Sequence, residues 1–324
     1  MKRILFLTTS NLNTPSTHYR VINYLNLKPE FSYKVIAVQK TFVKIIPILL
    51  RAVLYDTIFV QKKLFHRWQF FFLKKVSNKI IFDFDDAIFQ SLKKKVMQRF
   101  EYTIKNADMI ITGNHYLAHY IKRLNKNIVI MPTPVDIELY KQSEIRDTIR
   151  TIGWIGTKNN LKYLKMIEQT LNLLLKKHNL NFVVISDKKP DFDSELQYRY
   201  IKFERNSYPQ HLKEFDVGLM PLEDNEFTRG KCGFKILQYM AVSAIPLASA
   251  VGLNKEIIKN GVNGFLYEHN EDLFNKLEVI VSLNPEDVIK LKNKSFLTVK
   301  EHFNLQVYFP KWVSLFDDSA LNYL

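Results

Sequence analysis

The chain has 324 residues, of which 47% are hydrophobic and 24% are charged. This composition excludes a disordered tail, a collagen and a small disulfide-stapled domain, and the length suits about two domains with substantial cores. The single cysteine, Cys232, cannot form an internal disulfide, which favours a reducing compartment. The apolar run near the N-terminus is too short for a signal peptide, and no long uncharged apolar run predicts a membrane-spanning helix.

The net charge of +15 is concentrated in the first part of the chain. Residues 1–140 carry 22 basic and 9 acidic side chains, whereas residues 141–324 carry 25 and 23. A basic half is typical of proteins that bind nucleic acid, anionic lipid or phosphorylated substrates. The sequence has no RNP signature, zinc-finger spacing or basic heptad region, so we expect no nucleic-acid partner. A coding bias toward lysine is an alternative source of the excess charge.

Short apolar runs alternate with longer amphipathic stretches, which predicts parallel sheets with crossover helices. The strands predicted in the first half are 3–8, 34–38, 57–61, 79–83, 109–112 and 128–131. A proline-rich linker follows at 132–140. A second series of strands is predicted at 151–155, 182–186, 200–203, 216–220 and 245–248. The fold class is therefore α/β, with two open units whose ligands bind at the carboxyl ends of the strands.

The densest candidate site is the stretch RGKCGFKILQYM, residues 229–240. Gly230 and Gly233 predict a loop whose backbone can approach a ligand, and the apolar spacing predicts a helix from Phe234. The free N–H groups at the start of such a helix favour a phosphate. The stretch also contains three cations, Arg229, Lys231 and Lys235. The alternative is a glycine-turned loop with solvated lysines.

A second glycine loop, Gly153-Trp154-Ile155-Gly156-Thr157-Lys158, follows the first strand of the second series. It places two glycines, a hydroxyl and a cation at the end of a strand. If both loops lie at the same edge of one sheet, they face each other. One G-x-x-G segment is weak evidence, but two basic glycine loops in one α/β unit are better evidence of a phosphate site.

These motifs resemble a known family. The block RGKCGFKILQYM, with IPLAS and VG after it and IGWIGT and FDVGLMPL before it, resembles the nucleotide-sugar-binding half of retaining GT-B glycosyltransferases of family 4, the glycosyl transferases group 1. ADMIITGNHYLAHYI, followed by IMPTPVDIELY, resembles the segment before the second domain of that family. The resemblance implies two Rossmann-like domains that face a cleft: an acceptor-binding domain at 1–140, a nucleotide-sugar-binding domain at 141–305, and a terminal helix at 306–324 that packs toward the first domain.

The resemblance also implies which residues bind the donor. The family usually has glutamates at the positions of Gly230 and Gln238, the second of which touches the nucleotide ribose. Gln238 keeps an acceptor oxygen but lacks the charge. The family's Gly-Arg pair is replaced by Gly153-Trp154, so phosphate neutralisation is expected to shift to lysines and Arg229. The expected donor-binding residues are Gly153, Gly156, Thr157, Lys158, Arg229, Gly230, Lys231, Gly233, Phe234 and Gln238, and Lys235 is expected to act in catalysis.

Three carboxylates, Asp83, Asp85 and Asp86, follow a predicted strand of the first half. One interpretation is a D-x-D metal site like that of GT-A transferases, where Mg²⁺ bridges the diphosphate. We favour a catalytic acceptor-side role without metal, in which one aspartate accepts a hydrogen bond from a sugar hydroxyl; capping of the next helix is an alternative. Ser16 and Arg20 resemble the family's acceptor-side loop, and Arg20 is expected to meet a diphosphate.

Residues 40–55 and 62–75 mix bulky apolar side chains with Lys and Arg. They predict two core helices with basic edges. The aromatic turn Trp68–Phe72 exceeds what one buried stripe needs, and Lys62, Lys63, Lys74 and Lys75 flank it. This pattern indicates peripheral docking on an anionic membrane surface, on its cytoplasmic face.

Together these features predict a cytoplasmic, hexosyltransferase-type glycosyltransferase. We expect it to move a sugar from a nucleotide-sugar, with retention and without cofactor or metal, to a glycan or polyprenyl-linked acceptor in cell-surface polysaccharide or glycoconjugate synthesis. One alternative is a non-catalytic GT-B-fold subunit that binds a nucleotide or glycan. The other is a metal-dependent GT-A-like transferase that uses Asp83–Asp86.

Overall fold

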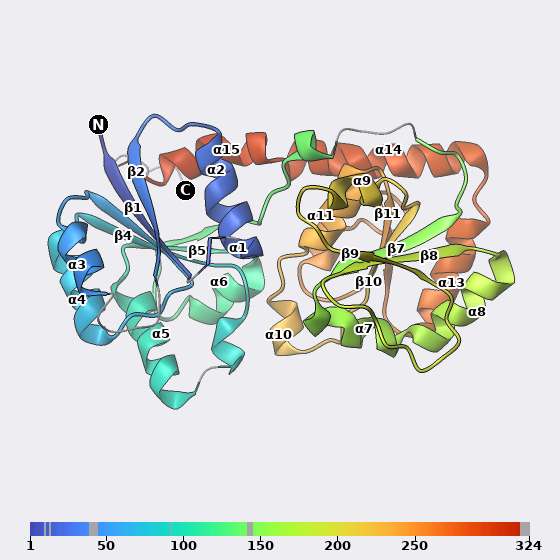
Figure 1. Ribbon diagram of the computed structural model, residues 1–324, viewed down its shortest axis with the longest axis horizontal. Coiled ribbons are helices and arrows are strands. Elements are labelled where there is room, and N and C mark those ends of the chain that lie inside the picture. The colour runs from blue at the N-terminus through green and yellow to red at the C-terminus, as the bar shows by residue number, and fades with distance from the viewer. Residues whose placement is uncertain (10, 13, 39–44, 92, 141–144, 318–324) are drawn as a thin grey trace. The chain divides into compact units, whose positions relative to one another are not determined.

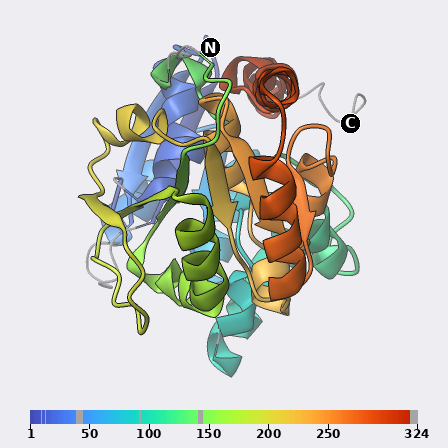
Figure 2. The ribbon, with the colours of Figure 1, turned by 90° about the vertical axis from the view of Figure 1, so that its right-hand side faces the viewer.

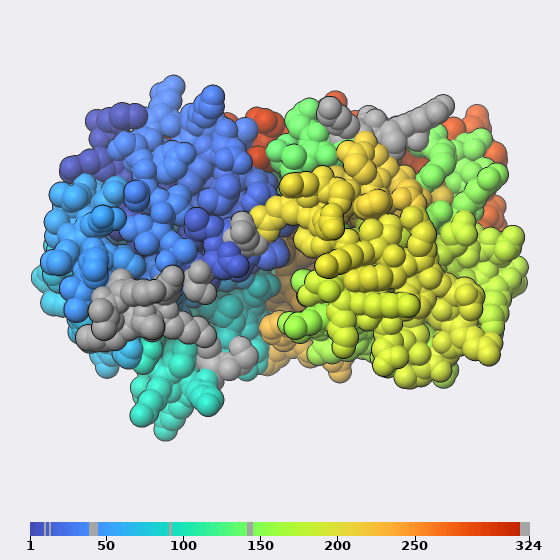
Figure 3. All heavy atoms as spheres, viewed as in Figure 1, coloured from blue at the N-terminus to red at the C-terminus, as the bar shows by residue number. Residues whose placement is uncertain are grey.

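The structure is a computed structural model that describes residues 1–9, 11–12, 14–38, 45–91, 93–140 and 145–317, drawn in colour in Figure 3. Parts of three predicted segments, residues 40–44, 141–144 and 318–324, lie outside this range. The chain divides into two compact units. The first comprises Met1–Pro134, Arg229–Cys232 and Leu305–Leu324, and the second comprises Val135–Thr228 and Gly233–Asn304.

The first unit contains a parallel sheet in the order β2-β1-β3-β4-β5-β6. Its strands are β1 (Arg3–Thr8), β2 (Ser32–Ala37), β3 (Thr57–Gln61), β4 (Lys79–Phe84), β5 (Met109–Thr112) and β6 (Ile128–Ile130). Every residue of β3, β4 and β5 is buried, as expected of a parallel sheet covered on both faces. Its helices are α1 (Pro15–Thr17), the π-turn His18–Ile22, α2 (Asn23–Asn26), α3 (Ile46–Ala52), α4 (Arg67–Val76), the 3-10 turn Ile88–Ser91, α5 (Lys94–Asn106) and α6 (His115–Ile121).

The helix α15 (Leu305–Ser314) also belongs to the first unit and covers its aromatic core. The ring of Trp312 stacks on Tyr24 at 4.7 Å between centroids and on Phe6 at 5.7 Å. Figure 1 shows α15 beside α2, with which it is in contact. This aromatic packing holds the terminal helix to the sheet, because large rings bury extensive apolar area.

The second unit contains a parallel sheet in the order β12-β11-β10-β7-β8-β9. Its strands are β7 (Thr151–Gly156), β8 (Asn181–Ser186), β9 (Arg199–Lys202), β10 (Val217–Met220), β11 (Ile245–Ser249) and β12 (Phe265–Tyr267). Helices flank both faces of this sheet (Figure 2). They are α7 (Leu161–Met166), α8 (Glu168–His178), α9 (Tyr208–Leu212), α10 (Glu226–Arg229), α11 (Phe234–Ala241), α12 (Asn254–Ile257), α13 (Asn270–Val281) and α14 (Pro285–His302), with 3-10 turns at Ile137–Leu139 and Lys158–Asn160.

The predicted α/β fold with two parallel sheets is confirmed, and each predicted strand lies within two residues of an observed one. Two expectations were wrong in detail. The three-residue strand β12 was missed because it is too short to show a period. The helix expected at 62–75 begins only at Arg67, where His66 and Gln69 form a capping box.

Candidate functional site

The strand order of the second sheet reverses beside β7. The chain runs from β7 to β8 and β9 on one side, and then to β10, β11 and β12 on the other. Ligands of open α/β sheets bind at the carboxyl ends of the strands, at such a switch point. The ends of β7 and β10, at Gly156 and Met220, therefore mark the candidate site.

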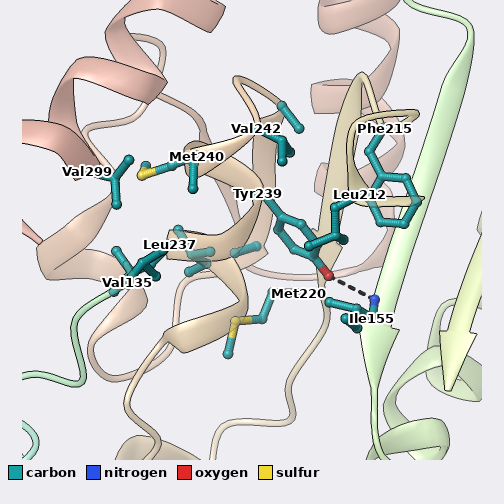
Figure 4. Close-up of a cluster of buried hydrophobic side chains, with 14 of the residues drawn as sticks. Val135, Ile155, Leu212, Phe215, Met220, Leu237, Tyr239, Met240, Val242 and Val299 are labelled. Atoms are coloured by element: carbon teal, nitrogen blue, oxygen red, sulfur yellow. Dashed lines mark hydrogen bonds between the residues drawn. The ribbon is translucent and has the colours of Figure 1, made fainter. Parts of the chain in front are cut away.

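Tyr239 of α11 separates β7 from β10 at this point. The two strands pair only through Ile152↔Val217 and Gly153↔Gly218. Beyond these pairs, the Tyr239 hydroxyl accepts the N–H of Ile155 at 3.2 Å, as the dashed line in Figure 4 shows, and donates to the Leu219 carbonyl at 2.9 Å. Burial raises the pKa of Tyr239, so the phenol keeps the proton that it donates. The Tyr239 hydroxyl thus bridges β7 and β10 where the two strands no longer pair directly.

The glycines of β7 have different roles. A Cβ at Gly153 would lie 2.2 Å from the ring of Phe215, so this glycine makes room for a core side chain. This packing accounts for the glycine at 153, and the expected contact of Gly153 with the donor stays a prediction. Its strand partner Gly218 makes room in the same way for the ring of Tyr239, also at 2.2 Å.

Gly156 adjoins two side chains, the buried ring of Trp154, which a Cβ here would meet at 2.5 Å, and Lys235. Gly233, with φ +62°, precedes α11, and Lys235 lies in the first turn of that helix. The Lys235 ammonium lies 4.1 Å from the centroid of the Trp154 ring, and a Cβ at Gly156 would lie 2.6 Å from its Nζ. A cation, a strand end and the start of a helix converge here, an arrangement that suits a phosphate.

Other cations lie at the same edge of the sheet. Thr157 and Lys158 are exposed, and the Lys158 N–H donates to Asp187 Oδ1 at 2.6 Å. Asp187 directly follows β8, and the exposed Lys188 and Lys189 come next. These two lysines were not predicted as site residues, although their position after the strand predicted at 182–186 was the signal that could have found them.

Gln238 is buried and oriented by two tyrosines. Its Nε2 donates to the hydroxyls of Tyr140 and Tyr208, each at 3.2 Å, and these hydroxyls lie 2.9 Å apart. The amide nitrogen is thus engaged by the tyrosine pair, and the carbonyl oxygen is the group of Gln238 that can accept from a ribose hydroxyl. Neither tyrosine was singled out from the sequence, because no local pattern connects them to Gln238.

The remaining residues expected to bind the donor belong to different units of the structure. Phe234 is half-buried and packs against the core of the second unit, and its expected role in donor binding stays a prediction. Arg229, Gly230 and Lys231 belong to the first unit. The stretch 229–240 therefore does not act as one loop of the second unit, and the cluster there consists of Gly156, Lys235 and their neighbours.

In the first unit, Arg20 is buried in an ion pair with Asp83. Its guanidinium donates to the Asp83 carboxylate at 2.5–3.1 Å, to the Met131 carbonyl at 2.9 Å and to Thr133 Oγ1 at 3.1 Å. The two side chains are only 3% and 1% exposed. Burial opposes the charge, but Asp83 outweighs it and raises the pKa of Arg20. Arg20 is thus held in a buried ion pair, and its expected contact with a diphosphate stays a prediction.

Lys62 holds the other two carboxylates. It follows β3 with φ +54°, and its ammonium forms ion pairs with Asp85 and with Asp86, the latter at 2.6 Å. The ammonium also donates to Ser16 Oγ at 2.8 Å, and Ser16 donates to Asp85 at 3.2 Å. Burial lowers the pKa of Lys62, but Asp85 and Asp86 outweigh it, and the pKa is raised. Lys62 was not predicted from the sequence as a member of this cluster.

The cluster at the carboxyl edge of the first sheet has three carboxylates and two cations, so its net charge is −1. Asp86, whose side chain is 39% exposed, is its most accessible carboxylate. This arrangement suits the hydroxyls of a neutral acceptor better than a diphosphate. Within the described ranges, no three His, Cys, Asp or Glu side chains are grouped so that they could hold a metal ion.

Residues 149–282 match the family described as Glycosyl transferases group 1, a span of less than half of the chain. A comparison with curated proteins found no match. Among solved structures, Anabaena HepE in complex with UDP is 14% identical, with a TM-score of 0.74 over 100% of both chains. Sucrose-phosphate synthase from Thermosynechococcus elongatus is 12% identical, with a TM-score of 0.73 over 97% of this chain and 98% of that one. A glycosyltransferase from Rickettsia africae is 13% identical, with a TM-score of 0.71 over 100% and 99%.

These similarities show that the chain has the two-domain GT-B glycosyltransferase fold. The span that matches the glycosyl transferases group 1 contains Gly156, Lys235 and Gln238. The family match and the phosphate-type cluster thus coincide in the second unit.

Proposed function

We propose that the protein transfers a hexose from a nucleotide-sugar to an acceptor hydroxyl, with the donor diphosphate at the carboxyl edge of the second sheet. One observation carries this proposal: Lys235 lies over Trp154 and beside Gly156, where β7 and β10 separate. The family match over residues 149–282 supports it. Because HepE has been crystallised with UDP and with UDP-glucose, these are the first ligands to test.

The chemistry follows from the charges at this edge. When the sugar leaves the nucleotide, negative charge develops on the diphosphate. Lys235 and the first N–H groups of α11 stabilise that charge, and the exposed Lys158, Lys188 and Lys189 add to the positive potential. This set of cations makes a divalent metal dispensable. Retention of configuration is supported only by the sequence resemblance to retaining enzymes.

We place the acceptor on the first unit, at the cluster around Lys62. Asp86 accepts a hydrogen bond from the reacting or a neighbouring hydroxyl, while Lys62 and Ser16 hold the carboxylates in position. The net negative charge of the cluster favours a hydroxyl over a phosphate group. A glycan, or the sugar of a polyprenyl-linked acceptor, has the required chemistry.

Calorimetric titration with UDP and UDP-glucose tests the donor site. Lys235→Gln should weaken UDP binding by about 10- to 100-fold, because it removes one charge-assisted contact. Lys255→Gln is the matched control, since Lys255 is exposed on α12 and the charge change is the same. Asp86→Asn should leave UDP binding unchanged and reduce sugar transfer. Wild-type affinity in Lys235→Gln would contradict the placement of the diphosphate.

A second candidate function is a binding subunit without catalytic activity. It is favoured by Gly230 and Gln238, which stand where the family usually has glutamates. A protein that binds UDP-glucose but neither hydrolyses it nor transfers glucose to any acceptor of a glycan panel would support this alternative.

A further inference from the structure

Two adjacent helices of the first unit expose apolar faces. In α3 and the turn that follows it, Ile46, Leu50, Val53 and Leu54 are 45–63% exposed. Their spacing of i, i+4, i+7 and i+8 places them on one side of the helix. In α4, Trp68 and Phe71 are 50% and 54% exposed at a spacing of i, i+3. The two helices are in contact (Figure 1). We call these six residues the α3–α4 face.

The α3–α4 face is not the core-facing side of these helices. The opposite sides are buried in the first unit through Ile48 and Leu49 of α3 and Phe70 and Leu73 of α4. Single exposed apolar residues are normal in soluble proteins. Six of them on two neighbouring helices, with two large aromatic rings among them, are typical of an interaction surface.

The charges on the two helices that carry this face are positive. Neither α3 nor α4 contains Asp or Glu, whereas Arg51, Arg67 and Lys75 are exposed along their edges. The Lys75 ammonium lies 5.5 Å from the centroid of the Phe71 ring. The helix α5, which contacts α4, carries further exposed lysines at its start, Lys94 and Lys95, and Lys93 precedes it.

The structure changes which residues form this surface. Lys62 was expected to flank the aromatic residues, but it lies in the ion-pair cluster at the edge of the first sheet. Lys74 pairs with Asp108, and Phe70 is buried. The surface therefore includes α3, and its cations are Arg51, Arg67 and Lys75.

We propose that the α3–α4 face docks on the surface of an anionic lipid bilayer, with its apolar side chains in the interface and its cations against lipid headgroups. A second copy of the chain fits less well, because a symmetric dimer through this face would bring the same cations together. Among the described helices, none is both long and apolar enough to span a membrane. Membrane docking does not depend on the proposed function. That docking brings the enzyme to a lipid-linked acceptor does rest on the proposed function.

Sedimentation with vesicles tests the proposal. The vesicles consist of phosphatidylcholine alone or with about one third phosphatidylglycerol, at about 50 and 500 mM NaCl. We expect binding only to the anionic vesicles, and weaker binding at high salt. Leu50→Ser with Phe71→Ser should reduce binding at least about tenfold. Arg51→Gln, Arg67→Gln and Lys75→Gln together should reduce it about fivefold for each cation.

Matched controls come from the second unit. Leu173→Ser with Val279→Ser removes apolar side chains that are 64% and 49% exposed. Lys176→Gln, Lys259→Gln and Lys290→Gln remove the same charge from exposed positions. Both controls should bind vesicles like the wild type. All variants should keep the wild-type affinity for UDP, so a failure of docking is distinguishable from a failure of the donor site.

Several outcomes would overturn the proposal. The first is that the protein does not bind anionic vesicles. The second is that it binds neutral vesicles equally well, and the third is that the variants of the α3–α4 face bind like the wild type. A fourth is a change of oligomeric state in analytical ultracentrifugation when Leu50 and Phe71 are replaced. That result would assign the face to a second copy of the chain instead of a membrane.

Discussion

Replacing Tyr239 with phenylalanine removes one oxygen from the point where β7 and β10 separate. The ring is fully buried against Gly218 and keeps its packing, so the change isolates the hydroxyl. Two backbone groups, the N–H of Ile155 and the carbonyl of Leu219, lose their hydrogen-bond partner at once. A buried polar group without a partner costs about 1–3 kcal/mol. We expect a loss of about 2–3 kcal/mol in the free energy of unfolding. This value lies near the lower end of the range for two unpaired groups, because the strands can relax toward each other.

Differential scanning calorimetry measures this loss. A domain of about 150–250 residues loses roughly 2–4 °C in Tm per kcal/mol, so the transition of the second unit should fall by roughly 4–12 °C. UDP identifies that transition, because a ligand raises the Tm of the unit that binds it. Hydrogen exchange of the peptide containing Ile155 should also become faster.

Tyr24→Phe is the control for this experiment. The Tyr24 hydroxyl is also buried, but it has no hydrogen-bond partner among the described residues. Its removal should leave Tm unchanged or slightly raised, since no bond is lost. A Tyr239→Phe protein that melts within about 1 °C of the wild type, with unchanged exchange at Ile155, would refute the bridging role of the hydroxyl.

Three further predictions concern the donor site and the metal. Gly156→Ala should lower the affinity for UDP about tenfold in calorimetric titration, because the new methyl group displaces the Trp154 ring and the Lys235 ammonium that lies over it; unchanged affinity would show that Gly156 and Lys235 do not share a ligand. Gln238→Glu should fold and bind UDP at least as tightly, since a neighbouring tyrosine hydroxyl can donate to the carboxylate, and a folded variant without UDP binding would contradict the match to the family's glutamate. Sugar transfer should continue in EDTA; a complete loss that Mg²⁺ restores would instead favour a metal at Asp83–Asp86.

The sequence by itself determined the features that depend on local pattern. Alternating apolar runs located eleven of the strands within two residues, because a buried parallel strand must be apolar over its whole length. Gly233 and the spacing after it located the start of α11. The rule that ligands bind at the carboxyl ends of parallel strands predicted that the two glycine loops face each other if they share a sheet edge; in the structure, Lys235 in the first turn of α11 adjoins Gly156.

The sequence could not show, in contrast, which lysines near the aromatic run are buried in ion pairs and which are exposed. Lys62 and Lys75 both flank the same aromatic run, but only the fold places Lys62 between Asp85 and Asp86. Likewise, Gly153 and Gly156 lie in one short motif. The first makes room for the Phe215 ring alone, whereas the second lies against both the Trp154 ring and Lys235, a difference that depends on what packs there.

Only the tertiary structure decided the contacts between distant segments. The Tyr239 hydroxyl meets Ile155 across 84 positions of sequence, Gln238 meets Tyr140 across 98, and Arg20 meets Asp83 across 63. Local periodicity specifies which face of an element is apolar, but it does not specify which polar groups meet when the elements pack. The register and the layering of the sheets decide those partners, because a buried polar group needs a hydrogen bond and only the packed elements determine which groups lie within reach.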